Sequence, residues 1–109
     1  MTNEGEGTQA ATISTEHTLL DLTTSKVFVP FVDLGNLASG DTVEIRVYTK
    51  VKSGGTLNCI YFASFTDAQS SNGGLVQVGI PVPSDHEWKF TLKQTAGTGR
   101  NFDWKVVSI

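Results

Sequence analysis

The chain has 109 residues, of which 39% are hydrophobic and 17% charged, and its formal net charge is −3. This length predicts one domain, which can bury a core without disulfides or metals. The charge balance argues against nucleic acid as a partner, because binding to phosphates depends on clustered basic residues. No stretch approaches the roughly 18 apolar residues of a membrane helix, so no membrane partner is expected. The start lacks the basic and apolar regions of a signal peptide, which predicts a product made in the cytoplasm.

Turn residues divide the chain into short segments. Residues 1–15 are polar and acidic and predict an extended N-terminal arm, followed by a β domain over 16–109. Loops are predicted at 35–41 and 66–74. Strands are predicted at 17–23, 26–34, 42–52, 56–65, 75–80, 87–94 and 101–109.

The segment 42–52 shows the clearest alternation of apolar and polar residues. Val43, Ile45, Val47 and Val51 point one way, and the charged and polar residues between them point the other way. No segment has a helical period, and turns recur about every 8–12 residues. The sequence therefore predicts an all-β protein, an antiparallel β-sandwich (jelly-roll-like or Ig-like) of seven or eight strands with the extended arm.

The stretch 96–100, Ala-Gly-Thr-Gly-Arg, resembles a phosphate-binding loop in composition only. Walker and dinucleotide loops feed a helix, and the Walker loop also needs a Lys-Ser/Thr pair. Here the glycines lie between two alternating segments. Gly97 and Gly99 are therefore expected to supply positive φ angles in a hairpin loop.

Other polar groups indicate no catalytic, cofactor or metal site. Asp85, His86 and Glu87 are adjacent, so in an extended chain they point to opposite sides and cannot share a metal; a turn is the expected structure. A small hydrolase would need a cleft with two close carboxylates. Cys59 falls in an apolar segment and is expected to be a buried, inert thiol. The sequence predicts a protein that is not an enzyme.

Four aromatic residues lie on the last two predicted strands. Paired in a hairpin, they would form a cluster in the core; the alternative is a platform that stacks on sugars. Their phase matches that of the other inward residues, which favours the core. These residues are Trp88, Phe90, Phe102 and Trp104.

Two predicted strands are apolar on both faces. In 56–65, Ile60 and Phe62 lie opposite Tyr61 and its neighbours, and 26–34 shows the same property. Pro30 within 26–34 indicates an edge strand or a bulge. Extra apolar faces suggest burial against another subunit, and the acidic arm is expected to reach that subunit. The candidate subunit interface is Phe28, Pro30, Ile60, Phe62, Arg46, Tyr48, Lys50 and Lys52.

At LASGDTVEIRVYTKVKSGG (37–55) and PVPSDHEWKFTLKQTAGTGRNFDWKV (81–106) the chain resembles small β-sandwich virion proteins of tailed phages and related viruses. The resemblance implies a non-enzymatic structural protein, a capsid decoration, minor capsid or tail component, made in the host cytoplasm and located in the virion. The implied partners are copies of itself, as a homo-oligomer with a trimer as one symmetry, and a major capsid or tail protein. The alternative is a carbohydrate- or receptor-binding β-sandwich module.

Overall fold

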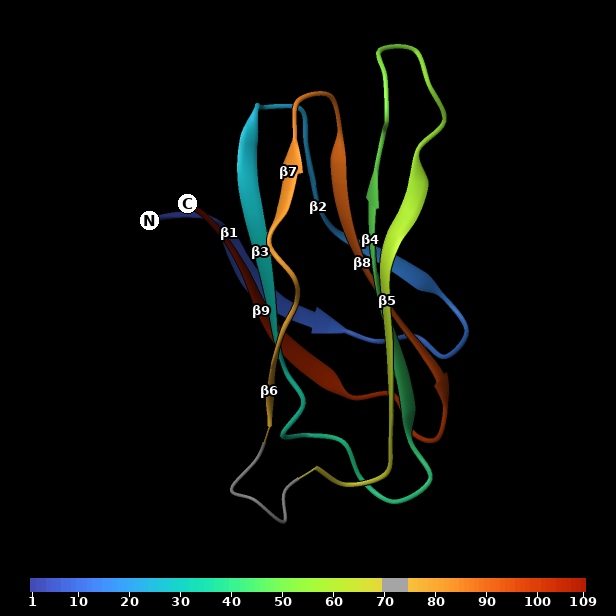
Figure 1. The fold of residues 1–109 in the computed structure, drawn as a ribbon. Helices are drawn as coiled ribbons and strands as arrows, with labels where there is room; N and C mark the ends of the chain where they lie inside the picture. Colours follow the sequence, from blue (N-terminus) through green and yellow to red (C-terminus); the bar gives the residue numbers. More distant parts are fainter. Residues whose placement is uncertain (70–74) are drawn as a thin grey trace.

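A computed structural model describes residues 1–69 and 75–109, so the predicted loop 66–74 lies mostly outside the described residues. The described residues form strands and no helix, and hence none long and apolar enough to cross a membrane. The strands (Figure 1) are β1 (Thr2–Ala10), β2 (Glu16–Leu22), β3 (Lys26–Asp33), β4 (Thr42–Thr49), β5 (Asn58–Thr66), β6 (Val76–Val78), β7 (Val82–Ser84), β8 (Trp88–Ala96) and β9 (Asn101–Ser108).

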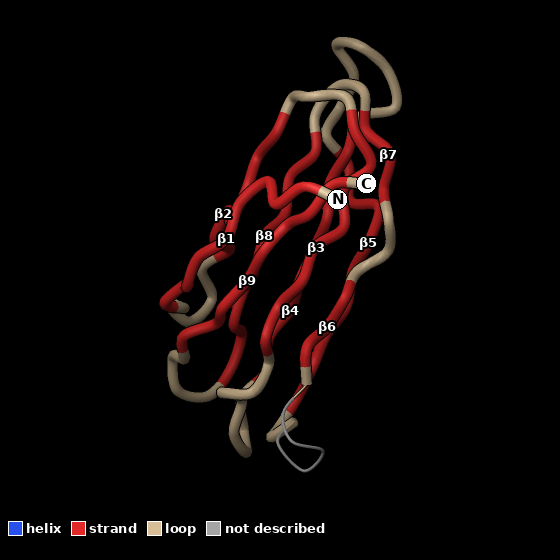
Figure 2. Tube along the Cα trace, turned by 90° about the vertical axis from the view of Figure 1, so that its left-hand side faces the viewer, coloured by secondary structure: helices blue, strands red, loops and turns tan. Residues whose placement is uncertain are grey.

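The strands form two antiparallel sheets. Sheet A has the order β1-β9-β3, and both β6 and β7 pair with the far side of β3. Sheet B has the order β2-β8-β4-β5. The two sheets lie one over the other in an elongated body, with the loops gathered at its two ends (Figure 2). The prediction of an all-β fold of antiparallel sheets is confirmed, although the described residues form nine strands rather than seven or eight.

The core lies between the two sheets. In β4 the alternation holds as predicted, because Val43, Ile45 and Val47 are all buried. Val51 follows the end of β4 and is 92% exposed, so it does not continue the inward series. The other buried members of the core come from both sheets and from the loop after β3: Phe28, Val32, Leu34, Leu37, Val82, Trp88, Phe90, Leu92, Phe102 and Val106.

The N-terminal segment pairs within its own chain, whereas the sequence analysis expected an extended arm that reaches another subunit. It forms β1, which pairs with β9 from Thr2–Ser108 to Ala10–Asn101 (Figure 1). One of its acidic side chains, Glu4, forms an ion pair within the chain, 2.9 Å from Nζ of Lys26. Gly7 lies opposite Trp104 of β9 and leaves room for its ring, because a Cβ there would be 3.4 Å from that ring.

Pro30 lies in a central strand, so the prediction of an edge strand is wrong. β9 pairs with one side of β3, while β6 and β7 pair with 31–33 and 26–28 on the other side. Between β6 and β7, the amide of Gly79 donates to the carbonyl of Pro30 (2.8 Å). Since both backbone groups of a residue in an antiparallel strand point to the same side, the N–H that proline lacks would face this break. The sheet is therefore interrupted between β6 and β7, and not in β3 itself.

The last two long strands do not form a hairpin, because β8 belongs to sheet B and β9 to sheet A. Trp88 on β8 is fully buried, and its ring lies 5.1 Å from that of Phe28 and 6.1 Å from that of Phe90. Phe102 is also fully buried. Trp104 is only partly buried and packs against the rim of the core beneath β1. The aromatic residues therefore serve the core, but from opposite sheets.

Candidate interaction surface

The loop after β8 already uses two of its amides, one of them to bind a buried carboxylate. Asp41 is 1% exposed and accepts from the amide of Thr98 (3.1 Å) and from Nε of Arg100 (2.7 Å). The amide of Arg100 donates to the side chain of Gln94 (3.0 Å). Gly97 has the predicted positive φ, +88°, whereas Gly99 is required by a close approach to a backbone carbonyl. An anion would meet a buried negative charge here, so the loop is structural.

The charge of Asp41 is stabilised by its donors. The hydrogen bond from Arg100 is the strongest influence that lowers the pKa of Asp41, and it outweighs the opposing effect of burial. The amides of Ala38 and Thr98 lower this pKa further. The carboxylate therefore joins the loop before β4 to the loop after β8 at one end of the molecule.

The segment 85–87 forms the predicted bend rather than a metal site. Nε2 of His86 lies 3.7 Å from Oδ1 of Asp85, while Glu87 forms an ion pair with Lys50 (3.1 Å). Burial, and then the hydrogen bond and charge of Glu87, raise the pKa of Asp21. In the described part of the chain, no group of three His, Cys, Asp or Glu side chains could hold a metal ion.

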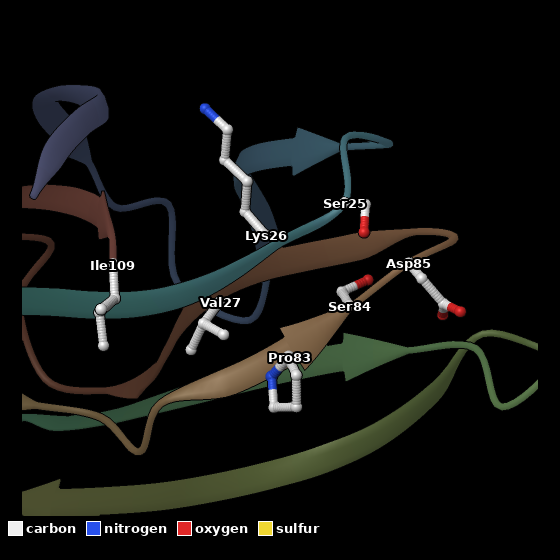
Figure 3. A pocket seen from close by; sticks show the side chains of 7 residues that line it. All are labelled: Ser25, Lys26, Val27, Pro83, Ser84, Asp85 and Ile109. Carbon is white, nitrogen blue, oxygen red and sulfur yellow. The ribbon is translucent and has the colours of Figure 1, made fainter.

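An open hollow of about 630 Å³ lies where β3 and β7 meet the end of β9 (Figure 3). Oγ of Ser84 is buried there and has no hydrogen-bond partner among the described residues. Asp85 carries the one side-chain carboxylate among the described residues that line the hollow, whereas the close pair Asp21 and Glu87 lies elsewhere. No pair of side-chain carboxylates, which glycoside hydrolysis would require, is found among the described residues of the hollow. Its lining is Ser25, Lys26, Val27, Pro83, Ser84, Asp85 and Ile109.

The outer face of sheet B carries large apolar side chains. Ile60 and Phe62 on β5 are 49% and 51% exposed. The guanidinium of Arg46 on β4 lies 4.8 Å from the centre of the Phe62 ring, and its Nη2 lies 2.9 Å from a carboxylate oxygen of Glu44. A cation held over a ring adds a favourable contact, so Arg46 helps to hold Phe62 in place while about half of this residue remains exposed.

Tyr48 lies next to this pair on the same face and is held by hydrogen bonds. Its hydroxyl donates to Glu16 on β2, which also accepts from the hydroxyl of Thr91 (2.7 Å). Burial tends to raise the pKa of Glu16, but these two donors and the nearby charges of Arg46 and Lys89 outweigh it and lower that pKa. Burial, and then the bond to Glu16, raise the pKa of Tyr48. The hydrogen bonds tie β2, β4 and β8 together across the face.

We call Arg46, Tyr48, Ile60 and Phe62 the outer patch. The sequence predicted all four as interface residues, and the structure brings them onto one face of sheet B.

The other predicted interface residues lie elsewhere. Phe28 and Pro30 are buried within the domain, which corrects their assignment to an interface. They belong to the inward-facing set of β3, a strand with apolar side chains on both faces. Lys50 and Lys52 follow the end of β4, and Lys50 is engaged by Glu87.

Cys59 is exposed, so the prediction of a buried thiol is wrong. A register shift explains it: Val47 pairs with Tyr61 and Tyr48 pairs with Cys59, which leaves Ile60 as an extra residue. Such a bulge shifts the alternation of side chains. Cys59 therefore shares the outer face with Tyr48 rather than the inner face with Tyr61.

The structure adds exposed apolar residues that the sequence analysis missed. Val76, Val78 and Ile80 are each about half exposed, with values of 54%, 48% and 45%. Nε2 of Gln77 donates to the hydroxyl of Tyr61 (2.7 Å), which places β6 opposite β5 at the same rim of the molecule. The alternation of Val76, Gln77 and Val78 was the available signal.

Comparison of the chain with protein-family models, with curated proteins and with solved structures finds no match. A fold alone does not specify a function, so the chemistry of the surface has to carry the argument.

Proposed function

We propose that this protein is a non-enzymatic structural subunit of a virus particle, a capsid decoration, minor capsid or tail component, that assembles with copies of itself and with a major capsid or tail protein. The observation that carries the proposal is the outer patch. Its two large apolar side chains, Ile60 and Phe62, both lie on β5. Each is about half exposed on the outer face of sheet B, which is otherwise polar. Contiguous exposed apolar surface rimmed by polar groups is typical of protein interfaces.

The connectivity of the strands supports the jelly-roll alternative among the predicted sandwiches. Because β6 and β7 both pair with β3, they can be counted as one interrupted strand, which leaves eight. The orders β1-β9-β3-β6/β7 and β2-β8-β4-β5 are then those of two four-stranded sheets joined by Greek-key connections. Jelly rolls occur in viral capsid proteins and also in lectins, so this argument is an analogy and the outer patch must carry the function.

The carbohydrate-binding alternative depended on exposed tryptophans. Trp88 is 0% exposed, and Trp104 is partly buried beneath Gly5 and Gly7 of β1. The Trp88 ring has no open face on which a sugar could stack, and the Trp104 ring is partly covered by β1. The placement of both rings therefore favours the structural role.

Light scattering over a range of protein concentrations tests the assembly. Phe62→Ser should weaken self-association about tenfold, since burying half of a phenylalanine contributes roughly 1.5 kcal/mol. The matched control is Val51→Ser, because Val51 is exposed, lies in the loop after β4 and is not a member of the patch. A glycan array probes the alternative: a protein that stays monomeric and binds one class of glycan would overturn the proposal.

A further inference from the structure

The outermost strand of sheet B is β5, and among the described residues its edge carries none of the usual protection. Its sequence, NCIYFASFT, contains no charged residue and no proline. Its bulge lies at Ile60, near its start, so 61–66 forms a regular edge. Unpaired backbone groups along such an edge are a template for another strand, and folded proteins normally block them with charges, prolines, bulges or short strands.

The other three edges of the two sheets carry such protection. β1 has Glu4 and Glu6 and a register shift between Asn3 and Gly5. β2 has charged side chains at both ends and a register shift of its own. The fourth edge is broken into β6 and β7, each three residues long, with Pro81 and Pro83 close by. The contrast singles out β5.

Backbone hydrogen bonds show which groups of β5 face outward. The amide of Asp67 donates to the carbonyl of Asp41 (2.8 Å), just beyond the paired residues Thr66 and Thr42. Because the direction of the backbone groups alternates along an antiparallel strand, residues 63 and 65 also face β4. Residues 62, 64 and 66 therefore face away from the sheet. In agreement, the side chain of Gln69 reaches the carbonyl of Thr66 (3.1 Å) from outside.

We propose that β5 of one molecule pairs antiparallel with β5 of a second copy, so that sheet B continues across the interface. An identical strand suits this edge, since two uncharged strands bring no like charges into opposition and each adds its own Ile60 and Phe62 to the outer face. Such a contact is isologous and has twofold symmetry. The inference rests on the proposed function and makes it more specific: the assembly grows in multiples of two.

Hydrogen exchange of the intact protein, followed by NMR at low and high concentration, tests this contact. The amides of Phe62 and Ser64 should exchange at least tenfold more slowly in the oligomer and lose that protection on dilution. The amides of Ala63 and Phe65, which already face β4, are the internal control and should stay protected throughout. An oligomer in which 62 and 64 remain unprotected, or a trimer, would overturn the β5 contact and leave assembly through another surface. A monomer at every concentration would overturn both proposals.

A pair of variants gives an independent test. Ser64→Pro removes an outward N–H without removing a bond to β4, whereas Ser64→Ala keeps that N–H. We expect the proline variant to be monomeric and the alanine variant to associate like the parent. Association of a folded Ser64→Pro variant at the parent's strength would refute the pairing. If the proline variant does not fold, the exchange experiment on the intact protein decides.

Discussion

Replacing Gly97 with alanine tests whether the buried carboxylate of Asp41 holds the loop ends together. Gly97 has a φ of +88°, and a Cβ there would lie 2.0 Å from Oδ1 of Asp41 and 2.8 Å from its Cα. Gly40 provides a matched control, because its φ is +87° and a Cβ there would meet nothing within 4 Å. Both substitutions impose the same backbone strain, but only the change at Gly97 displaces Asp41.

The expected costs follow from these contacts. Gly40→Ala should destabilise the fold by about 1–2 kcal/mol, the cost of a left-handed backbone for a residue with a Cβ. Gly97→Ala adds the disruption of the hydrogen bonds that Asp41 receives from Thr98 and Arg100 (3.1 and 2.7 Å). Breaking charged hydrogen bonds at a buried carboxylate costs roughly 3 kcal/mol more. The total approaches the lower end of ordinary domain stability, about 5 kcal/mol.

Urea unfolding followed by tryptophan fluorescence measures both free energies of unfolding, since Trp88 is fully buried in the folded protein. We expect Gly97→Ala to be less stable than Gly40→Ala by about 3 kcal/mol, with the same dependence on urea concentration. A difference below about 1 kcal/mol would refute the role assigned to Asp41. In that case the loop would accommodate the added methyl group by moving, with no loss of stability.

Three further outcomes are expected. Asp41→Asn should destabilise the protein at neutral pH, as measured by urea unfolding. The difference in free energy of unfolding from the parent should shrink as the pH falls below about 3.9 and through the lowered pKa of Asp41, because the parent then loses its charged acceptor as well. A constant difference down to pH 2 would contradict this. The thiol of Cys59 should react with a thiol reagent in native buffer within about tenfold of its rate in urea, because it is exposed; a requirement for denaturant would contradict the bulge. Tyr48→Phe should raise the pKa of Glu16, because its carboxylate loses a donor; an NMR titration of the carboxyl carbon measures this, and an unchanged pKa would contradict it.

Sequence reasoning predicted the strands that carry apolar runs, and it missed β1 and the three-residue β7. Val43, Ile45 and Val47 determine the inward face of β4 by their spacing alone. In β1 no large apolar side chain marks the strand, and its glycines suggest disorder. That segment is ordered by β9, whose residues follow more than ninety positions later. Pairing over such a distance leaves no local pattern to detect.

The sequence could predict which apolar residues of β5 are exposed, but not which apolar residues of β3 are exposed. Ile60 and Phe62 are half exposed as predicted from the apolar character of both faces of their strand. The same argument cannot choose between the two faces of β3. There the structure buries Phe28 and turns Phe31 outward, with Nζ of Lys105 4.7 Å from the centre of its ring. The bulge that exposes Cys59 depends on pairing with β4 and leaves no trace in composition.

The pairing of β1 with β9 also sets the timing of folding on the ribosome. Thr2 lies opposite Ser108, so β1 emerges long before β9, the strand with which it pairs, has been made. At about 5–20 residues per second, that delay is roughly 5–20 seconds. During this time β1 has no partner in its own chain. β1 has no large apolar side chain, which is why its sequence does not indicate a strand. For the same reason the unpaired segment offers little apolar surface for aggregation with other nascent chains.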